Sequence, residues 1–402
     1  MTSFRQALQR PSGRSLPVLA DCHACGTFKS CRSPKMLPVG KGKRKILILG
    51  DRPGREEDRQ GKPFVGSTGR YLAEVIRKVG YDLREDCVAS NAIICYSDSD
   101  NIDKEVLYCQ PNVVDLVQRL KPEVIVPAGQ QAVKSLLGWV WKENVGEISR
   151  WVGFQIPSQR LNAWICPTWN PAYLLRSQSK NGGKLDPILE RLFEQHIAGA
   201  FALEGRPWKA IPDYSKGIEL IYSPSEAAVA IRSFTEAGKP LAFDYETDRL
   251  KPDSKNARIF CCSISDGKRT IAYPWLGEAV QATSELLQSD VPKWGWNVKF
   301  EERWTYRTLG HGVRNWKWDG MVNAHLIDNR SAVTSLKFQA FVEFGIDAYD
   351  ADVKPYLESG GSNTPNRIFQ APLASVLRYC GWDALMEFRC CRKQMRDLGM
   401  IL

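Results

Sequence analysis

Two acidic residues past the middle of the chain have the spacing of a metal-binding pair. Asp244 and Glu246 lie in the segment Phe243-Asp244-Tyr245-Glu246-Thr247. Because a strand alternates its side chains between two faces, Asp244 and Glu246 are expected on the same face. Adjacent carboxylates repel unless a cation lies between them, and hydrolysis of a phosphodiester by two divalent ions needs such a cluster. The triplet alone is more typical of a solvated strand end.

Two later segments carry residues that could complete this site. Glu301 follows Asn297 by four positions, where a strand is expected to lead into a helix. Tyr379 and Asp383 are four positions apart in a helix expected over about residues 373–398, so they share one helical face. A helical carboxylate can bind metal, and a tyrosine hydroxyl one turn away can orient an attacking water. Together with the first pair, these residues predict a two-metal nuclease.

The three motifs have the order and spacing of a known group of exonucleases. They are D-x-E at 244–246, N-x-x-x-[D/E] at 297–301 and Y-x-x-x-D at 379–383. The chain over about residues 218–402 resembles the proofreading domain of family A DNA polymerases, a member of the DEDD exonuclease superfamily. The resemblance implies a ribonuclease H-like fold and 3′→5′ hydrolysis of DNA. It also implies two Mg²⁺ or Mn²⁺ ions, with Asp244, Glu246 and Asp383 as ligands.

The second motif departs from this family at its acidic position. The family usually has Asp there, whereas this chain has Glu301. Glutamate keeps the charge but is one methylene longer, so we expect weaker or shifted metal use rather than loss. The segment from Trp318 to Asp328 resembles the family helix between the second and third motifs, and Asp319 is expected to be its N-cap.

Cysteines suggest a second metal centre in the N-terminal half. Cys22 and Cys25 form a C-x₂-C pair, and Cys95 and Cys109 lie far downstream. Four thiolates can hold an iron–sulfur cluster or a zinc ion. A zinc site that recruits Cys31 is an alternative, as are four unrelated buried thiols.

A glycine-rich segment follows the apolar run 45–50. It reads G-D-R-P-G from Gly50 and continues to G-K-P-F-V-G, which includes Phe64. In α/β folds, ligands bind in loops at the carboxyl ends of strands, and glycines let the backbone approach them closely. Phe64 is expected to be an exposed loop aromatic that could stack on a flipped base. From these residues alone, a phosphate-binding loop is equally plausible.

The cysteine spacing and this loop together resemble the family 4 uracil-DNA glycosylases, over about residues 20–200. The loop is close to that family's first motif, Asn91 matches its uracil-contacting asparagine, and the segment 167–176 matches its second catalytic motif. The resemblance implies a glycosylase-like fold with a three-layer parallel sheet. It also implies a [4Fe–4S] cluster held by four ligands, namely Cys22, Cys25, Cys95 and Cys109.

Two substitutions in this half weaken the inference of uracil excision. The family has Glu in the first motif where this chain has Asp51, and His in the second where this chain has Asn170. That His is expected to stabilise the anionic uracil leaving group. Asparagine can donate a neutral hydrogen bond but cannot carry charge. We therefore expect the domain to bind DNA and to excise uracil feebly or not at all.

Charge is distributed unevenly along the chain. Residues 1–210 contain 31 Lys and Arg against 21 Asp and Glu, whereas residues 211–402 contain 24 of each, so the net charge of +10 lies in the first half. A basic half suggests a polyanion such as DNA, although a merely solubilising surface is the alternative. The sequence has no membrane-length apolar run and no secretory signal, so we expect a cytoplasmic protein, in the host cytoplasm if phage-encoded.

The elements alternate in the way that two α/β domains require. Short apolar runs at 45–50, 88–94, 123–129 and 162–169 predict strands separated by helices such as 68–79 and 111–120. In the second half, a helix is expected from the capping box at Ser223 to Gly238, followed by strands at 240–247, 258–265 and 269–275. The expected organisation is a tail (1–19), a glycosylase-like domain (20–204), a linker (205–217) and an exonuclease domain (218–402).

These features predict a metal-dependent 3′→5′ exonuclease acting on DNA in replication or repair. Its substrate is expected to be a 3′ end, single-stranded or in a primer–template. Because the sequence ends 19 residues after Asp383, a separate polymerase chain is the expected partner. The domain combination resembles the N-terminal part of some bacteriophage family A polymerases. The alternatives are a bifunctional glycosylase and exonuclease, and a non-catalytic subunit that clamps DNA for a polymerase.

Overall fold

The computed structural model describes residues 21–99, 102–141, 143–180, 184–206 and 213–400. These residues form two compact units. The first contains the described residues up to 206 together with 342–347, and the second contains the remaining described residues from 213 onward. The expected tail at 1–19 and the middle of the expected linker lie outside the described residues.

The first unit is built on a five-stranded sheet in the order β2-β1-β3-β5-β4. All neighbouring strands are parallel except β4 and β5, which are antiparallel. The strands are β1 (Ile46–Gly50), β2 (Cys87–Asn91), β3 (Val124–Ala128), β4 (Ile156–Ser158) and β5 (Ala163–Ile165). The four strands expected from apolar runs are confirmed, whereas the three-residue β4 gave too short a pattern to detect.

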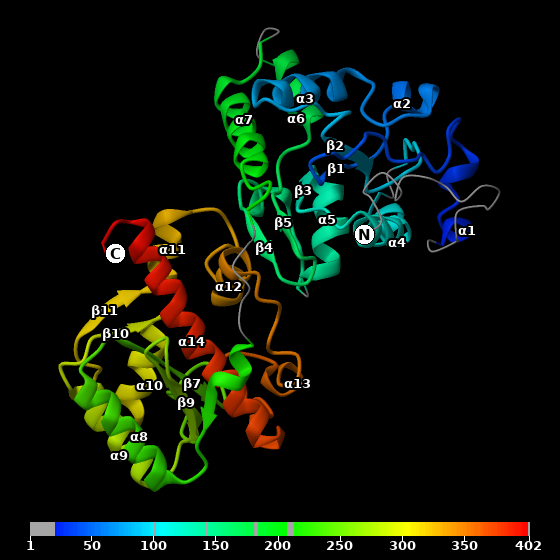
Figure 1. Cartoon of the computed structure of the whole chain (residues 1–402). Helices are drawn as coiled ribbons and strands as arrows, with labels where there is room; N and C mark the ends of the chain where they lie inside the picture. The colour runs from blue at the N-terminus through cyan, green and yellow to red at the C-terminus, as the bar shows by residue number, and fades with distance from the viewer. Residues whose placement is uncertain (1–20, 100–101, 142, 181–183, 207–212, 401–402) are drawn as a thin grey trace. The chain divides into compact units, whose positions relative to one another are not determined.

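Helices cover both faces of this sheet (Figure 1). Apolar side chains of β1, β2 and β3 pack with α3 and α7 in one continuous core, while α5 contacts β1 and β3 and packs against α4. The helices are α1 (Cys22–Cys25), α2 (Arg55–Gln60), α3 (Ser67–Lys78), α4 (Ile102–Leu120), α5 (Gln130–Val140), α6 (Pro171–Lys180) and α7 (Pro187–Phe201), with 3₁₀ turns η2 (Thr27–Lys29) and η3 (Ile148–Arg150). The expected three-layer glycosylase-like α/β fold is confirmed.

The helix α4 begins nine residues before the expected start at Pro111. Proline fits best in the first turn of a helix, so the sequence favoured a start there. In the structure, buried Val106, Cys109 and Val113 continue one apolar stripe through the proline. Burial of this stripe outweighs the backbone hydrogen bond that a proline inside a helix removes.

The second unit has a six-stranded mixed sheet in the order β11-β10-β7-β8-β9-β6. Strand β8 is antiparallel to β7 and β9, and the other neighbours are parallel. The strands are β6 (Ile218–Leu220), β7 (Leu241–Thr247), β8 (Ile259–Ser265), β9 (Thr270–Pro274), β10 (Lys293–Gly295) and β11 (Trp316–Asp319). The three consecutive strands predicted from the sequence are β7, β8 and β9.

Helices lie on both faces of this sheet. The helices of the unit are α8 (Pro224–Ala237), α9 (Gly277–Gln288), α10 (Lys299–Leu309), α11 (Gly320–Ile327), α13 (Lys354–Leu357), α14 (Leu373–Asp397) and the first part of α12 (Leu336–Phe344), whose residues 342–344 belong to the first unit; the 3₁₀ turns are η4 (Tyr214–Gly217) and η5 (Ile368–Gln370). The expected caps of α8 are confirmed, because Ser223 accepts a hydrogen bond from the Glu226 amide and Gly238 ends the helix with φ of 60°. The long C-terminal helix is also confirmed as α14.

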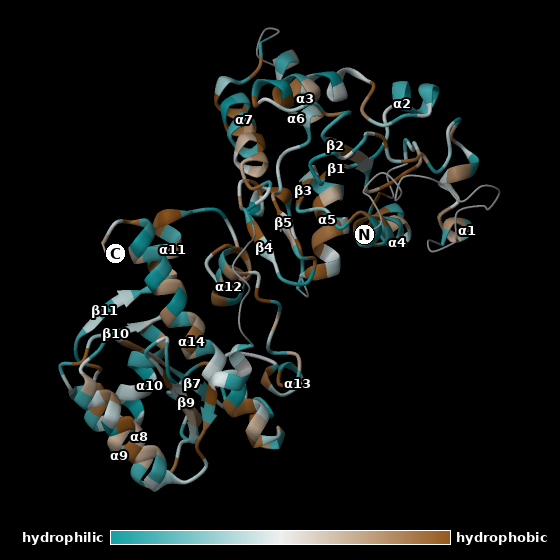
Figure 2. Cartoon of the chain, in the orientation of Figure 1, coloured by the Kyte–Doolittle hydropathy of each residue, from teal (hydrophilic) through white to brown (hydrophobic). Residues whose placement is uncertain are grey.

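Strand β7 separates the core of this unit from its acidic side. Phe243 and Tyr245 are buried in a core that includes residues of α8, α9 and α10. The alternate residues, Asp244 and Glu246, lie on the opposite face, which α14 crosses (Figure 1). In Figure 2 the hydrophobic residues of α5 and α9 stand out in brown, as expected for helices that pack on a sheet. The fold therefore presents carboxylates on one face of a strand whose other face packs into the core.

Candidate functional site

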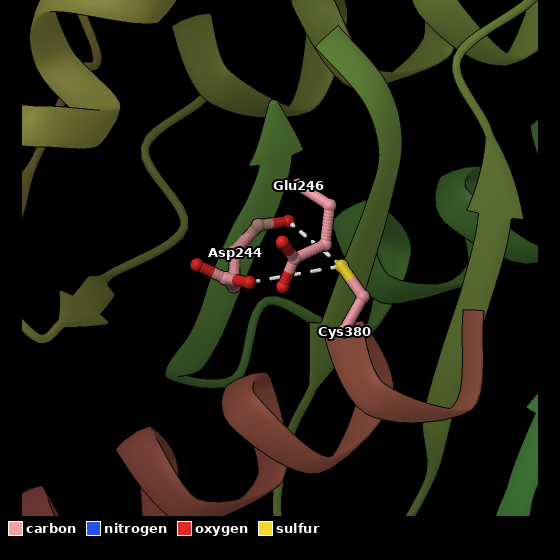
Figure 3. A group of neighbouring side chains, drawn as sticks. All are labelled: Asp244, Glu246 and Cys380. Carbon is pink, nitrogen blue, oxygen red and sulfur yellow. Dashed lines mark hydrogen bonds between the residues drawn. The ribbon is translucent and has the colours of Figure 1, made fainter. Parts of the chain in front are cut away.

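The strand β7 and the helix α14 bring three possible ligand atoms together. One carboxylate oxygen of Asp244, one of Glu246 and the sulfur of Cys380 all lie within 4.8 Å of one another. Figure 3 shows the two carboxylates on the strand and Cys380 reaching toward them from the helix. The Cys380 thiol donates weakly to Asp244 Oδ2 at 3.7 Å and to the Asp244 carbonyl at 3.6 Å. Asp244 and Glu246 therefore lie on the same face of β7, as their spacing predicted.

Glu301 joins the same centre from the first turn of α10. Its carboxylate, that of Asp244 and that of Glu387 contribute oxygens that lie within 4.8 Å of one another. Glu301 is 2% exposed and Glu387 is 3% exposed. A longer acidic residue at the second motif thus still reaches the carboxylates of β7 and α14.

Asp383 lies one turn before Glu387 on α14 and is also buried. The Tyr349 hydroxyl donates a hydrogen bond to its Oδ1. Burial raises the pKa of Asp383, while Lys337 and hydrogen bonds from Tyr349 and Tyr379 oppose that rise. Tyr379, expected to act beside Asp383, is therefore within hydrogen-bonding reach of it.

Electrostatics show that these carboxyl groups do not stay ionised together without a counter-charge. Burial, followed by the charge of Asp383, raises the pKa of Asp244 to about 8. Burial and the Asp244 charge also raise the pKa values of Glu246 and Glu301. Divalent cations offset both causes, because they supply positive charge and oxygen-ligand bonds in place of water. The donor set of carboxylate oxygens is the one that Mg²⁺ and Mn²⁺ prefer, so the residues fit these ions.

Asp319 positions the second motif. Its carboxylate accepts from the Met321 and Val322 amides, so the expected N-cap role in α11 is confirmed. The same carboxylate accepts from the amides of Asn297 and Val298, both at 3.1 Å. Asn297 adopts a left-handed conformation with φ of 66°, which asparagine tolerates better than most residues. Asp319 therefore fixes the turn that leads into α10 and Glu301.

Three residues of this centre were missed from the sequence: Tyr349, Cys380 and Glu387. Glu387 follows Asp383 by four positions, so the helical spacing that linked Tyr379 to Asp383 would also have found it. Tyr349 comes from an irregular segment between α12 and α13 and has no spacing relative to the motifs. Its position depends on tertiary packing alone.

In the first unit, Asp51 ends up as a cap for a helix. Its Oδ1 accepts from the Gln131 and Ala132 amides at 2.7 and 3.0 Å, in the first turn of α5. The other oxygen, Oδ2, accepts from Asn170 Nδ2 at 2.8 Å. Gly129, with φ of 125°, makes room for this carboxylate, because a Cβ there would lie 2.2 Å from Asp51 Oδ2. Burial raises the pKa of Asp51, and these hydrogen bonds oppose the rise.

Asn170 is held at both ends of its side-chain amide. Its Oδ1 accepts from the Ala172 amide at 2.9 Å, at the start of α6, while its Nδ2 donates to Asp51. The two positions that depart from the glycosylase motifs are therefore bonded to each other. Each side chain also satisfies backbone amides at the start of a helix, as N-caps do.

Phe64 and Asn91 lie together beside Gly50. A Cβ on Gly50 would be 2.4 Å from Asn91 Oδ1 and 2.8 Å from the Phe64 ring. The expectation that Phe64 is an exposed aromatic was wrong, because it is only 8% exposed and belongs to the core of the unit. Arg84 Nη2 donates to the carbonyls of Pro63 and Phe64 and holds this loop inward.

All four cysteines singled out from the sequence line one small cavity. Cys22 and Cys25 come from α1, Cys95 follows β2 and Cys109 lies on α4. In the described part of the chain, no three cysteine sulfurs lie within 4.8 Å of one another. Tetrahedral zinc needs sulfurs about 3.8 Å apart, given Zn–S distances of about 2.3 Å.

Cys31, the alternative zinc ligand, does not line this cavity. Its thiol contacts the Phe28 carbonyl at 3.8 Å and makes a hydrogen bond with the thiol of Cys95. All twelve cysteines are free thiols in the structure.

The N-terminal half matches known glycosylases. Residues 37–193 match the family model described as the uracil DNA glycosylase superfamily. A type-4 uracil-DNA glycosylase of Archaeoglobus fulgidus is 30% identical over 144 residues, covering 33% of this chain and 71% of that protein. One from Thermotoga maritima is 30% identical over 164 residues, covering 39% of this chain and 80% of that protein. The chain belongs to the type-4 uracil-DNA glycosylase family. That family implies an iron–sulfur centre.

The C-terminal half matches a different family. Residues 218–398 match the model described as 3′-5′ exonuclease. The C-terminal half is therefore a 3′-5′ exonuclease domain, and the chain is an enzyme. An exonuclease domain of this kind implies a divalent metal. The expected combination of a glycosylase-like unit with an exonuclease is confirmed.

Several solved nucleases are also similar to part of the chain. Escherichia coli RNase D is 11% identical, with a TM-score of 0.33 and coverage of 45% of each chain. NrnC of Brucella melitensis is 13% identical, with a TM-score of 0.32, covering 46% of this chain and 84% of that chain. At these scores the similarities carry no part of the assignment. A search of the described residues finds no helix that is both long and apolar enough to cross a membrane.

Proposed function

We propose that this enzyme removes nucleotides from the 3′ ends of DNA, using two Mg²⁺ or Mn²⁺ ions at the acidic centre of its second unit. The observation that carries the proposal is the convergence of buried carboxylates from three motifs. Asp244, Glu246 and Asp383 would hold the ion nearest the attacking water, and Glu301 would serve the outer ion. Bound ions of this kind supply an activated water and stabilise the charge of the in-line displacement.

The chain's own residues orient the reaction. Burial raises the pKa of Tyr379, so its hydroxyl keeps its proton and can donate to a water or to Asp383. Tyr349 holds Asp383 in a fixed position through its hydrogen bond. Because these groups are fixed before substrate binds, little reorganisation is needed when charge develops.

We further propose that the nuclease proofreads in DNA replication or repair, together with a DNA polymerase on a separate chain. The support is the resemblance of the three motifs to the proofreading domains of family A polymerases, including those of some bacteriophages. Transfer of a primer end between two sites is faster when both belong to one assembly, because association raises the effective concentration. Such a complex would work in the cytoplasm, in a phage-encoded case that of the host.

For the first unit, we propose DNA binding with little or no uracil excision. Asn170 stands where the glycosylase family has histidine, and its Nδ2 donates a hydrogen bond to Asp51 Oδ2 at 2.8 Å. This amide is neutral, so it cannot offset the negative charge of a departing uracil as a protonated histidine can. The excess positive charge of residues 1–210 favours the phosphate backbone. We also assign Cys22, Cys25, Cys95 and Cys109 as ligands of a [4Fe–4S] cluster.

We propose that residues 20–204 and 218–402 act as separate domains joined by the linker 205–217. Phe64 and Asn91 would then line a remnant base pocket in the first domain. This pocket could still recognise uracil without cleaving its bond.

One assay separates this proposal from its alternatives. The full chain is incubated with labelled single-stranded DNA, primer–template DNA and RNA of the same sequence, with and without uracil, in Mg²⁺ or Mn²⁺. We expect metal-dependent shortening of DNA from the 3′ end, and few alkali-sensitive abasic sites. Abundant abasic sites together with shortening would instead support the bifunctional enzyme. Tight DNA binding without shortening would support the non-catalytic subunit and contradict the proposal, as would digestion of RNA alone.

The polymerase partner is tested separately by co-purification at low salt from the native host. We expect a DNA polymerase to be recovered with the chain. Recovery of the chain without a polymerase would contradict this part of the proposal.

A further inference from the structure

We propose that Glu387 is a fifth acidic metal ligand. Together with Glu301 and Asp244, it would bind the outer cation, which is the second of the two ions at the exonuclease centre. This inference rests on the proposed function, since it concerns the same two-metal site. None of the three motifs that define the site contains Glu387. It is distinct from the four carboxylates that those motifs supply.

Glu387 and Glu301 reach the same group of oxygens from two different helices. Glu387 lies on α14, one helical turn after Asp383, whereas Glu301 lies in the first turn of α10. One oxygen each from Asp244, Glu301 and Glu387 lies within 4.8 Å of the others. Three oxygens at such distances can all reach one ion at the 2.0–2.1 Å distances typical of Mg²⁺, after small rotations of the side chains.

Glu387 and Glu301 each have a carboxylate oxygen without a protein partner. Oε2 of Glu387 and Oε2 of Glu301 are buried and make no hydrogen bond in the described structure. Glu387 as a whole is 3% exposed and Glu301 is 2% exposed. A buried polar atom without a partner is costly, so it calls for an explanation such as a missing ion.

The charges around Glu387 point to a cation rather than to another hydrogen-bond donor. The four charged groups that act on it most strongly are all acidic: Asp244, Glu301, Asp383 and Asp319. A purely structural glutamate in such a place would destabilise the fold by like-charge repulsion. A divalent ion shared with Asp244 removes that repulsion and satisfies both unpartnered oxygens.

Binding of the outer cation by both Glu301 and Glu387 also explains how the second motif can have glutamate in place of the usual aspartate. Glu301 is longer than the usual aspartate and comes from α10, while Glu387 comes from α14. The outer ion would then be held between two helices, with Asp244 shared by both ions. The outer ion would therefore be displaced toward α10 and α14, and the site would still bind it.

The test counts bound Mn²⁺ in the full chain by electron paramagnetic resonance and measures the rise in melting temperature that Mn²⁺ causes. Glu387→Gln keeps the shape of the side chain and removes its charge. The matched control is Asp397→Asn, an acidic residue at the exposed end of the same helix that pairs with Lys393. Asp244→Asn is included, with DNA digestion measured for every variant.

We expect two Mn²⁺ ions in the wild type and in Asp397→Asn. In Glu387→Gln, one of them should bind at least about tenfold more weakly, as happens when support for a metal is removed. Without metal, Glu387→Gln should melt no lower than the wild type, because glutamine has nearly the same shape and the Glu387 Oε2 that it replaces makes no hydrogen bond. Its stabilisation by Mn²⁺ should be smaller.

Unchanged Mn²⁺ binding in Glu387→Gln would overturn the inference. So would a lower metal-free melting temperature with unchanged stabilisation by Mn²⁺, which is the mark of a structural residue. If Glu387→Gln does not fold, Glu387→Asp is measured instead: weaker binding of one ion supports the inference and equal binding overturns it. Failure of the proposed function looks different, because Asp244→Asn would then still digest DNA.

Discussion

At the scale of single residues, the two halves of the molecule treat their substituted motif positions differently. In the exonuclease unit, Glu301 replaces an aspartate and still brings its oxygen to Asp244. In the glycosylase-like unit, Asp51 and Asn170 replace Glu and His and bond to each other. The first change keeps a negative charge among the buried carboxylates, whereas the second replaces a residue that can carry positive charge with a neutral amide.

The Asp51–Asn170 pair leads to a prediction about uracil excision. Loss of a group that stabilises a developing anion costs on the order of 10²–10³ in rate, so the wild type should form few abasic sites in a uracil-containing duplex. The double variant Asn170→His with Asp51→Glu should recover part of this activity, because it restores a group that can carry positive charge. Alkaline cleavage of abasic sites gives the measurement.

Rapid excision by the wild type would contradict this account of the pocket. If the double variant remains as inactive as the wild type, other pocket residues must also have changed. A suitable control is Asn162→His, since Asn162 lies in the turn between β4 and β5, away from the pair.

Site residues that are related by local spacing could be predicted from the sequence, whereas those positioned by packing could not. Asp244 with Glu246, and Tyr379 with Asp383, follow from the periods of a strand and a helix. Phe64 was expected on the surface because it stands in a glycine-rich loop. The structure buries it, since Arg84 ties the loop inward and Gly50 leaves space for the ring. Such a contact between distant segments has no signature in the sequence.

At the scale of elements, strong local signals were reliable and weak ones were not. The helix bounds expected for α8 and α14 agree with those of the structure, Pro224–Ala237 and Leu373–Asp397. The strands β4, β6 and β11 have three or four residues each, which is too short for a clear alternating pattern. They form because neighbouring strands supply hydrogen-bond partners, which a local pattern does not reveal.

The strand β10 contains a buried lysine that should make stability depend on pH. Lys293 is 0% exposed, and its Nζ donates to the Ser289 carbonyl at 2.7 Å. Burial lowers its pKa from 10.5 to about 8. Between these values the unfolded chain binds the proton and the folded chain does not, so this residue's contribution to the unfolding free energy rises as pH increases from about 8 to 10.5.

Urea unfolding of the wild type and Lys293→Met checks this prediction. The wild type should gain on the order of 2 kcal/mol relative to the variant between pH 7.5 and 10.5, since one pKa unit corresponds to about 1.4 kcal/mol. The exposed Lys268→Met serves as the control and should show no such trend. A difference between wild type and Lys293→Met that stays constant with pH would show that Lys293 titrates normally.

At the scale of the whole molecule, the chain joins two units with different chemistry. The first belongs to a glycosylase family and the second is an exonuclease domain. The excess of basic residues lies in the first half and the buried acidic centre in the second. Division into two α/β domains was predictable because the motifs and the break near residue 210 are visible in the sequence.

The cluster assignment predicts that the two units lose stability separately. Anaerobically purified protein should be brown and contain iron, and Cys95→Ser or Cys109→Ser should lose the colour. Because binding of a structural metal is coupled to folding, these variants should lose the melting transition of the first unit and keep that of the exonuclease. Calorimetry and iron analysis provide the measurements.

Cys166→Ser is the matched control, because this buried cysteine of the same unit does not line the cysteine cavity. It should remain brown. Colourless wild-type protein with one zinc per chain would contradict the iron assignment while keeping the four-ligand site.

The central claim, a metal-dependent 3′→5′ exonuclease at the carboxylates of β7, α10 and α14, is tested most directly by Asp244→Ala on a DNA strand labelled at its 5′ end. Asp290→Ala is the control, since Asp290 is an exposed residue of the same unit paired with Arg314. The wild type and the control should shorten the strand stepwise only when Mg²⁺ or Mn²⁺ is present, and Asp244→Ala should be at least about 10²-fold slower while folding normally. Equal digestion by Asp244→Ala and the wild type would contradict the account.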